Sequence, residues 1–493
     1  MSRDADWTRF LQWSRTLTDL AGASSLAGWD RETGMPPAGG EGRARMLGTL
    51  AAMHHREVVR DDIGAVLARL TEDSGDDEAR AAMVRLAVRD RERALRVPES
   101  LVRALSEASS RCVMVWIEAR PADDVGSWCD ALAPLVDLTR ERAHALAGDG
   151  GEPYDALLDE FEPGATAAQL EPLFAELREG LAPILEAAAG HGRPLPASRW
   201  DRDAQMGIAH LIADLVGFDR ESGAIAQSAH PFTCSPHVGD VRFTTRTRED
   251  DPIGNVTAVM HEAGHALYDQ GMPAEHAGTP VHAAPSLGAH ESQSRFWENH
   301  IGRTRAFWSL MTPHMRAAFP DAMTGLDDDA LYHAATFVEP SLIRVEADEV
   351  TYNLHVILRF ELELALIRGD LAVADLPDAW NEKMRELLGI VPGTHTDGVM
   401  QDIHWPEGMF GYFPTYTVGS IYAAQLAEAA EQELGPLADL TRDGEFAGVL
   451  AFLRERVHRH GATLPAQELI GRATGLPQRP DELLSHLRRA YTA

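Results

Sequence analysis

The stretch from Asp251 to Gly271 reads DPIGNVTAVMHEAGHALYDQG and carries the features of a capped, buried helix. Asp251 suits a helix N-cap, Pro252 suits the first helical position and Gly271 favours a stop. A helix is therefore predicted over 252–270. Apolar residues surround it on most sides, which predicts burial. These are Val256, Val259, Met260, Ala263, Ala266 and Leu267.

Within this predicted helix lies the pattern His261-Glu262-Ala263-Gly264-His265. Residues four apart lie one turn apart on the same helix face, so both imidazoles can reach one ion. Glu262 lies beside them and can take a proton from a metal-bound water. Because two buried histidines need polar partners, the context favours a metal site over a surface helix with solvated histidines.

A catalytic zinc site requires a third protein ligand. The metzincin extension is excluded, because Tyr268 and Gly271 stand where Gly and His are required. The remaining candidates are Glu275, His276, His282, His290, Glu291 and Glu298. Glu291 has the best context, 26 residues after His265 and near the start of a helix predicted over 286–301 that can return antiparallel. The alternative for Glu291 is a carboxylate that complements the dipole of that helix.

Most of the remaining chain has the three-to-four spacing of apolar residues that predicts helices. Predicted helices span 5–22, 41–72, 76–95, 98–120, 124–147, 167–190 and 341–368. The segment 230–248 is rich in Thr, Val, Phe and Pro and predicts a short hairpin or extended stretch. The fold class is therefore all-α with a small β hairpin, and 190–196 is the best linker candidate.

The composition of the 493 residues restricts the partners. The formal net charge of −31 argues against nucleic acid or an anionic membrane as the main partner. Three cysteines form no disulfide framework, and we recognise neither a secretory signal nor a membrane-spanning stretch. A cytoplasmic location is the expectation.

Six motifs, taken in order, resemble the carboxypeptidase Taq family of zinc metallocarboxypeptidases. They are HPF at 230–232, DVRFT at 240–244, HEAGH at 261–265, HESQ at 290–293, IRVEAD at 343–348 and GVMQDIHW at 398–405. The segment GYFPTY at 411–416 also looks family-like. Together the motifs cover most of the chain and are far more specific than the metal motif alone.

The resemblance implies a helical body divided by a deep cleft with zinc at its floor, similar to angiotensin-converting-enzyme-like and oligopeptidase-like peptidases. It implies one peptidase domain over 1–493, in which 1–190 form one cleft wall and 197–493 carry the metal site. It also implies a homodimer that removes single residues from peptide C-termini with broad side-chain tolerance. The site residues carried over are His261, His265 and Glu291 as zinc ligands and Glu262 as the base. Cobalt or manganese can substitute in such a ligand set.

The C-terminal motifs supply candidates for the oxyanion donor of the tetrahedral intermediate. They are His404, Tyr412 and Tyr416, and we prefer Tyr416 over Tyr412. Core packing is the alternative for both tyrosines. The residues expected to support the site are Gln401, Asp402 and Trp405, and those expected to accept the second N–H of a ligand histidine are Asp348, Glu298 or Asp402.

An exopeptidase must also bind the C-terminal carboxylate, for which arginine has the best geometry. Arg344 is our first candidate and Arg242 the second, because both lie in family motifs. The alternatives are ion pairs of Arg344 with Asp348 and of Arg242 with Asp240. His230 and the extended stretch after it are expected to pair with the substrate backbone as an added strand.

Two rival functions remain open at this point. One is a dipeptidyl carboxypeptidase or oligoendopeptidase on the same fold, which would release two residues or internal fragments. The other is an inactive metal- or peptide-binding protein, against which the presence of Glu262 argues, since this residue serves as base and not as ligand.

Overall fold

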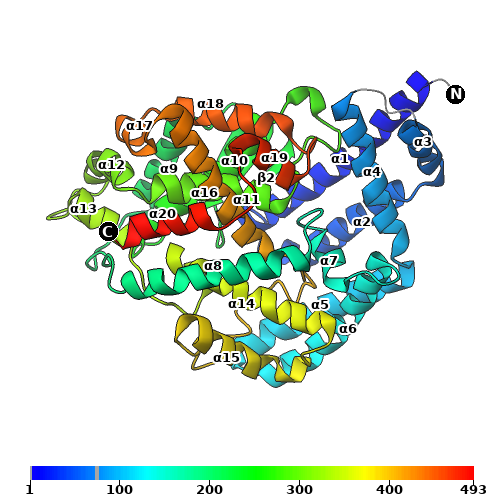
Figure 1. Cartoon of the computed structure of the whole chain (residues 1–493), viewed down its shortest axis with the longest axis horizontal. Helices are drawn as coiled ribbons and strands as arrows, with labels where there is room; N and C mark the ends of the chain where they lie inside the picture. Colours follow the sequence, from blue (N-terminus) through cyan, green and yellow to red (C-terminus); the bar gives the residue numbers. More distant parts are fainter. Residues whose placement is uncertain (1–2, 73–76, 493) are drawn as a thin grey trace. The chain divides into compact units, whose positions relative to one another are not determined.

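The computed structural model describes residues 3–72 and 77–492 (Figure 1). The chain divides into two compact units, each assembled from three separate segments. Unit 1 comprises 1–94, 194–335 and 422–478, and unit 2 comprises 95–193, 336–421 and 479–493. Helices make up most of both units, so the mainly helical fold class is confirmed. One boundary, between Arg193 and Pro194, lies within the predicted linker. The division into a cleft wall at 1–190 and a metal-site and C-terminal helical part at 197–493 stays a prediction.

Unit 1 contains most of the N-terminal helices and the helix with the HEAGH motif. Its helices are α1 (Arg3–Thr33), α2 (Gly40–Val58), α3 (Asp61–Glu72), α4 (Glu78–Arg96), α9 (Arg202–Val216), α10 (Pro252–Gly271), α11 (Leu287–Arg295), α12 (Arg305–Ala318), α13 (Asp328–Ala335), α17 (Leu437–Asp443), α18 (Phe446–Arg456) and α19 (Ala466–Thr474). A π-helical turn (Phe296–Gly302) follows α11. Short 3₁₀ turns lie at Pro37–Gly39, Ala274–His276 and His458–His460.

The helix predicted over 41–72 is two helices, α2 and α3. The N–H of Val59 bonds back to the carbonyl of His55 and closes α2, and α3 restarts with Asp61 and Asp62 in its first turn. Acidic residues are favourable there because they complement the helix dipole. α1, α3 and α4 then enclose an apolar cluster that includes Phe10 and Val66.

A three-stranded sheet lies beside α10 in unit 1. Its strands are β1 (Gly223–Gln227), β2 (Thr233–His237) and β3 (Asp240–Thr245), in the order β1-β3-β2. β2 and β3 form the predicted hairpin, with Thr233 opposite Phe243, and β1 runs parallel to β3. β1 is not predicted from the sequence, because GAIAQ has only one β-branched residue and no regular alternation.

The two helices of the predicted metal site begin as expected. Asp251 accepts a hydrogen bond from the Gly254 N–H at 2.8 Å and caps α10. Ser286 accepts one from the Ala289 N–H at 2.9 Å and caps α11. Both caps satisfy backbone donors that have no partner inside the helix. The predicted helix over 286–301 is therefore confirmed, with its last part in the π conformation.

Unit 2 is built around α14, whose residues are almost all buried. Its helices are α5 (Glu99–Ala122), α6 (Val125–Ala147), α7 (Pro153–Leu158), α8 (Ala167–Ala187), α14 (Glu349–Arg368), α15 (Leu376–Leu388) and α20 (Asp481–Tyr491), with 3₁₀ turns at Arg344–Glu346 and Val373–Asp375. α16 (Pro414–Leu434) begins in unit 2 and ends in unit 1. α14 starts later than the predicted 341, because Asp348 accepts hydrogen bonds from the N–H groups of Val350 and Thr351 and caps it there.

Within 3–72 and 77–492, no helix is both long enough and apolar enough to cross a bilayer.

Candidate functional site

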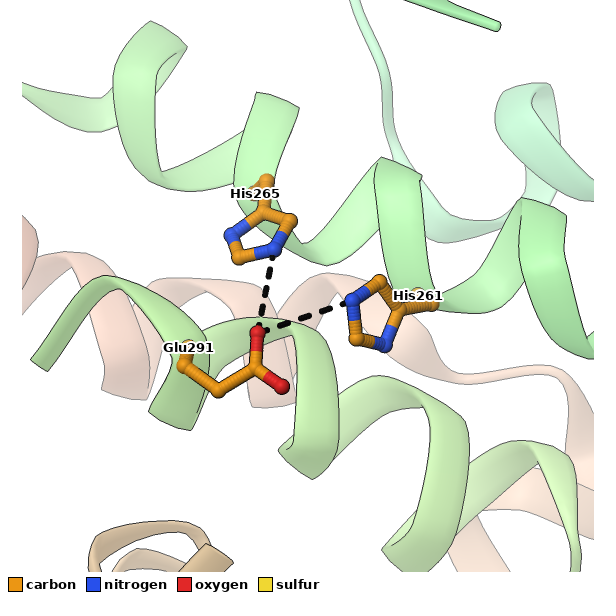
Figure 2. Close-up of side chains that lie close together, drawn as sticks. All are labelled: His261, His265 and Glu291. Carbon is orange, nitrogen blue, oxygen red and sulfur yellow. Dashed lines mark ion pairs between the residues drawn. The ribbon is translucent and has the colours of Figure 1, made fainter. Parts of the chain in front are cut away.

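Three of the predicted side chains meet between α10 and α11 (Figure 2). His261 and His265 project from successive turns of α10, and Glu291 faces them from α11. Glu291 Oε2 lies 3.6 Å from His261 Nε2 and 3.3 Å from His265 Nε2. One donor atom from each residue lies within 4.8 Å of the other two, so all three can bind one ion.

The close approach of the two helices depends on Gly264, which lies inside the motif. A Cβ at this position would be 2.5 Å from the Gln293 carbonyl oxygen and 2.7 Å from Ser294 Cα. Backbone atoms cannot yield as a flexible side chain can, so any larger residue would push α11 away. Gly264 therefore brings Glu291 within reach of the histidines, a role that the sequence analysis missed.

Glu291 is oriented by residues of its own helix. Arg295 Nε donates to Glu291 Oε1 at 2.7 Å, and Ser294 Oγ donates to Oε2 at 2.9 Å. Burial alone would raise the pKa of Glu291, but Arg295 and His261 hold that pKa well below its usual value. The carboxylate is thus ionised, the form that binds a metal.

His261 has the supporting acceptor that a metal-binding histidine needs. Its Nδ1 lies 2.8 Å from Glu298 Oε2, which leaves Nε2 facing Glu291. Arg303 Nη2 donates to the other oxygen of Glu298 at 2.7 Å. Of the three acceptors considered from the sequence, Glu298 occupies this place. Asp348 instead caps α14.

His265 stacks on His290, with ring centroids 4.4 Å apart and an interplanar angle of 13°. His290 in turn lies 3.0 Å from Asp269 Oδ1 through its Nε2. Burial, followed by the charge of His290, lowers the pKa of His265 to about 4, so its imidazole is neutral at neutral pH. Its Nδ1 is buried without a hydrogen-bond partner in the described part of the chain. Two imidazoles and an ionised carboxylate form a donor set that fits zinc, and also cobalt or manganese.

Glu262 is buried beside this set, with a relative exposure of 6%. Burial is the main cause of its raised pKa, and it outweighs the opposing effect of His261. A carboxylate with a raised pKa suits a general base that must later return its proton.

A second group of predicted residues lies in unit 2, around Asp402. Arg344 Nη2 lies 2.9 Å from Asp402 Oδ1, and Arg359 Nη2 lies 2.5 Å from Asp402 Oδ2. Asp402 is therefore shared by two guanidiniums and is not a partner of a ligand histidine. The alternative pairing of Arg344 with Asp348 is wrong, because Asp348 caps the helix instead. Gln401 supports Arg344 by accepting its backbone N–H at 2.9 Å.

The three candidate oxyanion donors gather beside Arg344 in unit 2. The ring centroid of His404 lies 5.2 Å from that of Tyr412 and 6.5 Å from that of Tyr416. The guanidinium carbon of Arg344 lies 5.0 Å from the ring centroid of Tyr416. Burial and then the charge of Arg344 lower the pKa of His404 to about 4, so it is neutral at neutral pH.

Arg242 and His230 lie in unit 1, in and before the β hairpin. Arg242 Nε donates to Asp240 Oδ1 at 2.5 Å, so the ion pair considered from the sequence is present. Its guanidinium also lies over the ring of Trp29, 5.7 Å from the centroid. His230 is exposed, and its backbone carbonyl accepts a hydrogen bond from Ser228 Oγ. Their roles in substrate binding stay predictions.

The sequence analysis also missed Arg295 and Arg359. The spacing of Arg295, four residues after Glu291, is a signal that was available. Arg359 offered no such signal, since its partner Asp402 lies 43 residues away.

Comparisons with known proteins agree with these observations. The carboxypeptidase Taq (M32) metallopeptidase family matches residues 9–491. The chain is 43% identical over 510 residues to thermostable carboxypeptidase 1 of Thermus thermophilus, covering 100% of this chain and 99% of the relative. It is 34% identical over 490 residues to carboxypeptidase 1 of Bacillus subtilis, covering 98% and 97%.

A solved structure agrees as well. The M32 carboxypeptidase from Deinococcus radiodurans R1 matches with a TM-score of 0.96 and 38% identity over 99% of both chains. The family match, the relatives and this structure agree over nearly the whole length. The chain therefore belongs to the carboxypeptidase Taq (M32) family of metallopeptidases and is a metallocarboxypeptidase.

Proposed function

We propose that this enzyme is zinc-dependent and releases single amino acids from peptide C-termini, with broad side-chain tolerance. The observation that carries the proposal is the convergence of His261, His265 and Glu291 in a chain of this family. These three residues would hold the metal, and the metal, when bound, would polarise a water molecule and the scissile carbonyl. Cobalt or manganese could replace zinc.

Glu262 is the proposed general base. It takes a proton from the attacking water and later delivers it to the leaving amine. Its burial supports this role, because a carboxylate that is weakly solvated accepts a proton more readily.

The residues of unit 2 are proposed to act on the substrate. Tyr416 is the preferred oxyanion donor, with His404 and Tyr412 as alternatives. Arg344 is proposed to bind the C-terminal carboxylate, and the sharing of Asp402 with Arg359 supports this, because one carboxylate neutralises only one of two guanidiniums.

Two residues near the β hairpin are further candidates for substrate binding. Arg242 is the second candidate for the C-terminal carboxylate, although it is already paired with Asp240. His230 precedes β2, which is an edge strand of its sheet and therefore suits pairing with a peptide backbone.

We further propose that the enzyme is a cytoplasmic homodimer. Each chain forms one peptidase domain, and the substrates are peptides. The family resemblance suggests the dimer. The free state of Cys112, Cys129 and Cys234 suits a reducing compartment.

The test compares wild type with Glu262→Gln. Bound metal is measured in both, and a peptide with a blocked N-terminus is followed by mass spectrometry. We expect about one zinc per chain in both proteins, and stepwise loss of one C-terminal residue with wild type only. Release of dipeptides or internal fragments would identify a dipeptidyl carboxypeptidase or oligoendopeptidase. If wild type binds zinc but does not cleave the peptide, the result would favour the alternative of an inactive metal- or peptide-binding protein.

A further inference from the structure

Thr233 connects the β hairpin to the proposed base. It is the first residue of β2, and its side chain reaches α10. Thr233 Oγ1 lies 2.7 Å from Glu262 Oε2 and 3.1 Å from the Glu262 carbonyl oxygen. That carbonyl lies inside α10 and is already the acceptor of a helix hydrogen bond. Since a hydroxyl has one proton, the closer and charged carboxylate oxygen is its acceptor.

The two oxygens of Glu262 thus have different surroundings. Among the residues that the structure describes, Thr233 is the one side chain that donates to this carboxylate, and Oε1 has no protein donor. We propose that Thr233 is a positioning residue: it holds Glu262 through Oε2 and leaves Oε1 to receive the proton of the attacking water. This inference rests on the proposed role of Glu262 as base.

The backbone around Thr233 is fixed, which such a role requires. The preceding residue, Phe232, accepts a hydrogen bond from the Thr244 N–H at 2.9 Å and donates its own N–H to Thr244 Oγ1 at 3.0 Å. Its ring packs against Trp29, with centroids 5.5 Å apart. Thr233 itself stands opposite Phe243 in the antiparallel ladder. The hydroxyl therefore belongs to a paired strand and not to a loose loop.

Glu291 is held by a charged donor, whereas Glu262 is held by a neutral hydroxyl, and this difference fits their different roles. Its carboxylate is held by the guanidinium of Arg295, which provides a positive charge beside a residue that must stay ionised as a ligand. Glu262 must instead accept and return a proton, and Thr233 orients it with a neutral donor. A glutamate has three side-chain torsions, so one strong hydrogen bond restricts a large share of its freedom.

The experiment compares Thr233→Val, which keeps the shape and removes the hydroxyl, with Thr233→Ser, which keeps the hydroxyl. Thr247→Val is the matched control, because Thr247 Oγ1 donates to Gln227 Oε1 at 2.8 Å, within the same part of unit 1. We measure kcat and KM on the N-blocked peptide, bound zinc and the thermal unfolding midpoint. General-base catalysis contributes roughly 10²–10⁴-fold, so loss of its orientation is expected to lower kcat about 10–100-fold.

The expected pattern has two parts. In Thr233→Val, kcat falls while KM, zinc content and the thermal midpoint match those of Thr247→Val. In Thr233→Ser, kcat returns to within about threefold of wild type.

Other outcomes overturn the inference. These are an unchanged kcat in Thr233→Val, a loss that Ser does not rescue, or a loss that follows zinc content. If wild type cleaves the peptide and Glu262→Gln does not, any of these results counts against Thr233 alone. If wild type does not cleave, the proposed function itself fails.

Discussion

Two buried charge clusters of this enzyme have opposite compositions. In unit 1 the guanidinium of Arg295 bridges two carboxylates, with Nε 2.7 Å from Glu291 Oε1 and Nη1 3.3 Å from Glu298 Oε2. In unit 2 the carboxylate of Asp402 bridges two guanidiniums, those of Arg344 and Arg359. The same residue types are buried in both clusters, so burial does not distinguish them. In unit 1 the guanidiniums of Arg295 and Arg303 face the three carboxylates of Glu262, Glu291 and Glu298, whereas in unit 2 two guanidiniums share one carboxylate. The sign of the excess charge therefore distinguishes the two clusters.

This difference indicates what each cluster can bind. A buried charge without a partner is costly, so a cluster with excess charge favours a ligand of opposite sign. The carboxylate-rich cluster around His261 and His265 suits a cation. The guanidinium-rich cluster around Asp402 suits an anion, such as the carboxylate at a peptide C-terminus.

The largest effect is expected from removing the charged ligand of the first cluster. Glu291→Gln keeps the size of the side chain but loses its charge, so the site retains two imidazoles and one weak amide donor. We expect bound zinc to fall well below stoichiometric amounts and kcat/KM to fall more than about 1000-fold. Atomic absorption and peptide cleavage measure the two effects.

Glu275→Gln is the matched control, because Glu275 was also a candidate ligand in the sequence and is exposed. It should retain zinc and activity. A Glu291→Gln enzyme with full zinc content would mean that unit 1 does not select a cation through this carboxylate.

The next effect tests the second cluster. Asp402→Asn leaves Arg344 and Arg359 buried with no carboxylate between them. Breaking a buried ion pair costs about 3–5 kcal/mol, so the thermal midpoint should fall by several degrees. Asp370→Asn, at an exposed position of the same unit, should leave it unchanged. An unchanged midpoint in Asp402→Asn would indicate that the guanidiniums are not held by this charge.

A third carboxylate, whose hydrogen-bond donors are all neutral, has a pKa shifted in the opposite direction. Glu363 lies one turn beyond Arg359 on α14, is fully buried and accepts hydrogen bonds from three neutral donors. They are Tyr154 Oη at 2.9 Å, Trp405 Nε1 at 2.8 Å and the Gly411 N–H at 2.9 Å. Burial raises the pKa of Glu363 to about 7, whereas the guanidiniums of Arg344 and Arg359 lower that of Asp402 despite its burial.

This contrast predicts a pH dependence of stability. The folded-state pKa of Glu363 exceeds its ordinary value of 4.5, so folding binds a proton between these values and stability falls as pH rises from 4.5 through 7. Glu363→Gln removes this pH dependence. The free energy of unfolding of the variant relative to wild type should therefore rise by about 3 kcal/mol between pH 4.5 and 7, and its relative thermal midpoint should rise with it. Glu382→Gln, exposed on α15, should show a constant difference. A constant difference for Glu363→Gln would contradict the raised pKa.

Local chemistry explains which parts of the fold were predictable. The start of α10 at Asp251 follows from a cap, a proline and an apolar face, all within one short segment. The start of α14 was misplaced, because the helical spacing continues back to 341 and only the hydrogen bonds of Asp348 fix the boundary. β1 was missed, since its pairing with β3 is a tertiary contact.

In the site, too, local spacing was predictable from the sequence, whereas contacts between distant segments were not. His261 and His265 are one turn apart, so their spacing alone predicts a shared ligand. Gly264 and Thr233 act through contacts with other elements. The residue type alone does not predict such contacts. Asp402 was placed near the chemistry by its motif, but its arginine partners come from different segments.

The smallest effect tests the bridge of the first cluster. Arg295→Lys keeps the positive charge but replaces a planar fork by a single ammonium, which cannot reach Glu291 and Glu298 with the same geometry. Supporting groups of metal ligands contribute about 10–100-fold to affinity, and the retained charge places the expected loss in zinc affinity near tenfold. Competition with a chelator measures it, and Arg305→Lys, on the exposed ion pair with Asp329, serves as control. Zinc affinity equal to wild type would mean that charge alone holds Glu291. The bridge of Arg295 would then differ in kind from that of Asp402, where removal of the charge itself is expected to be decisive.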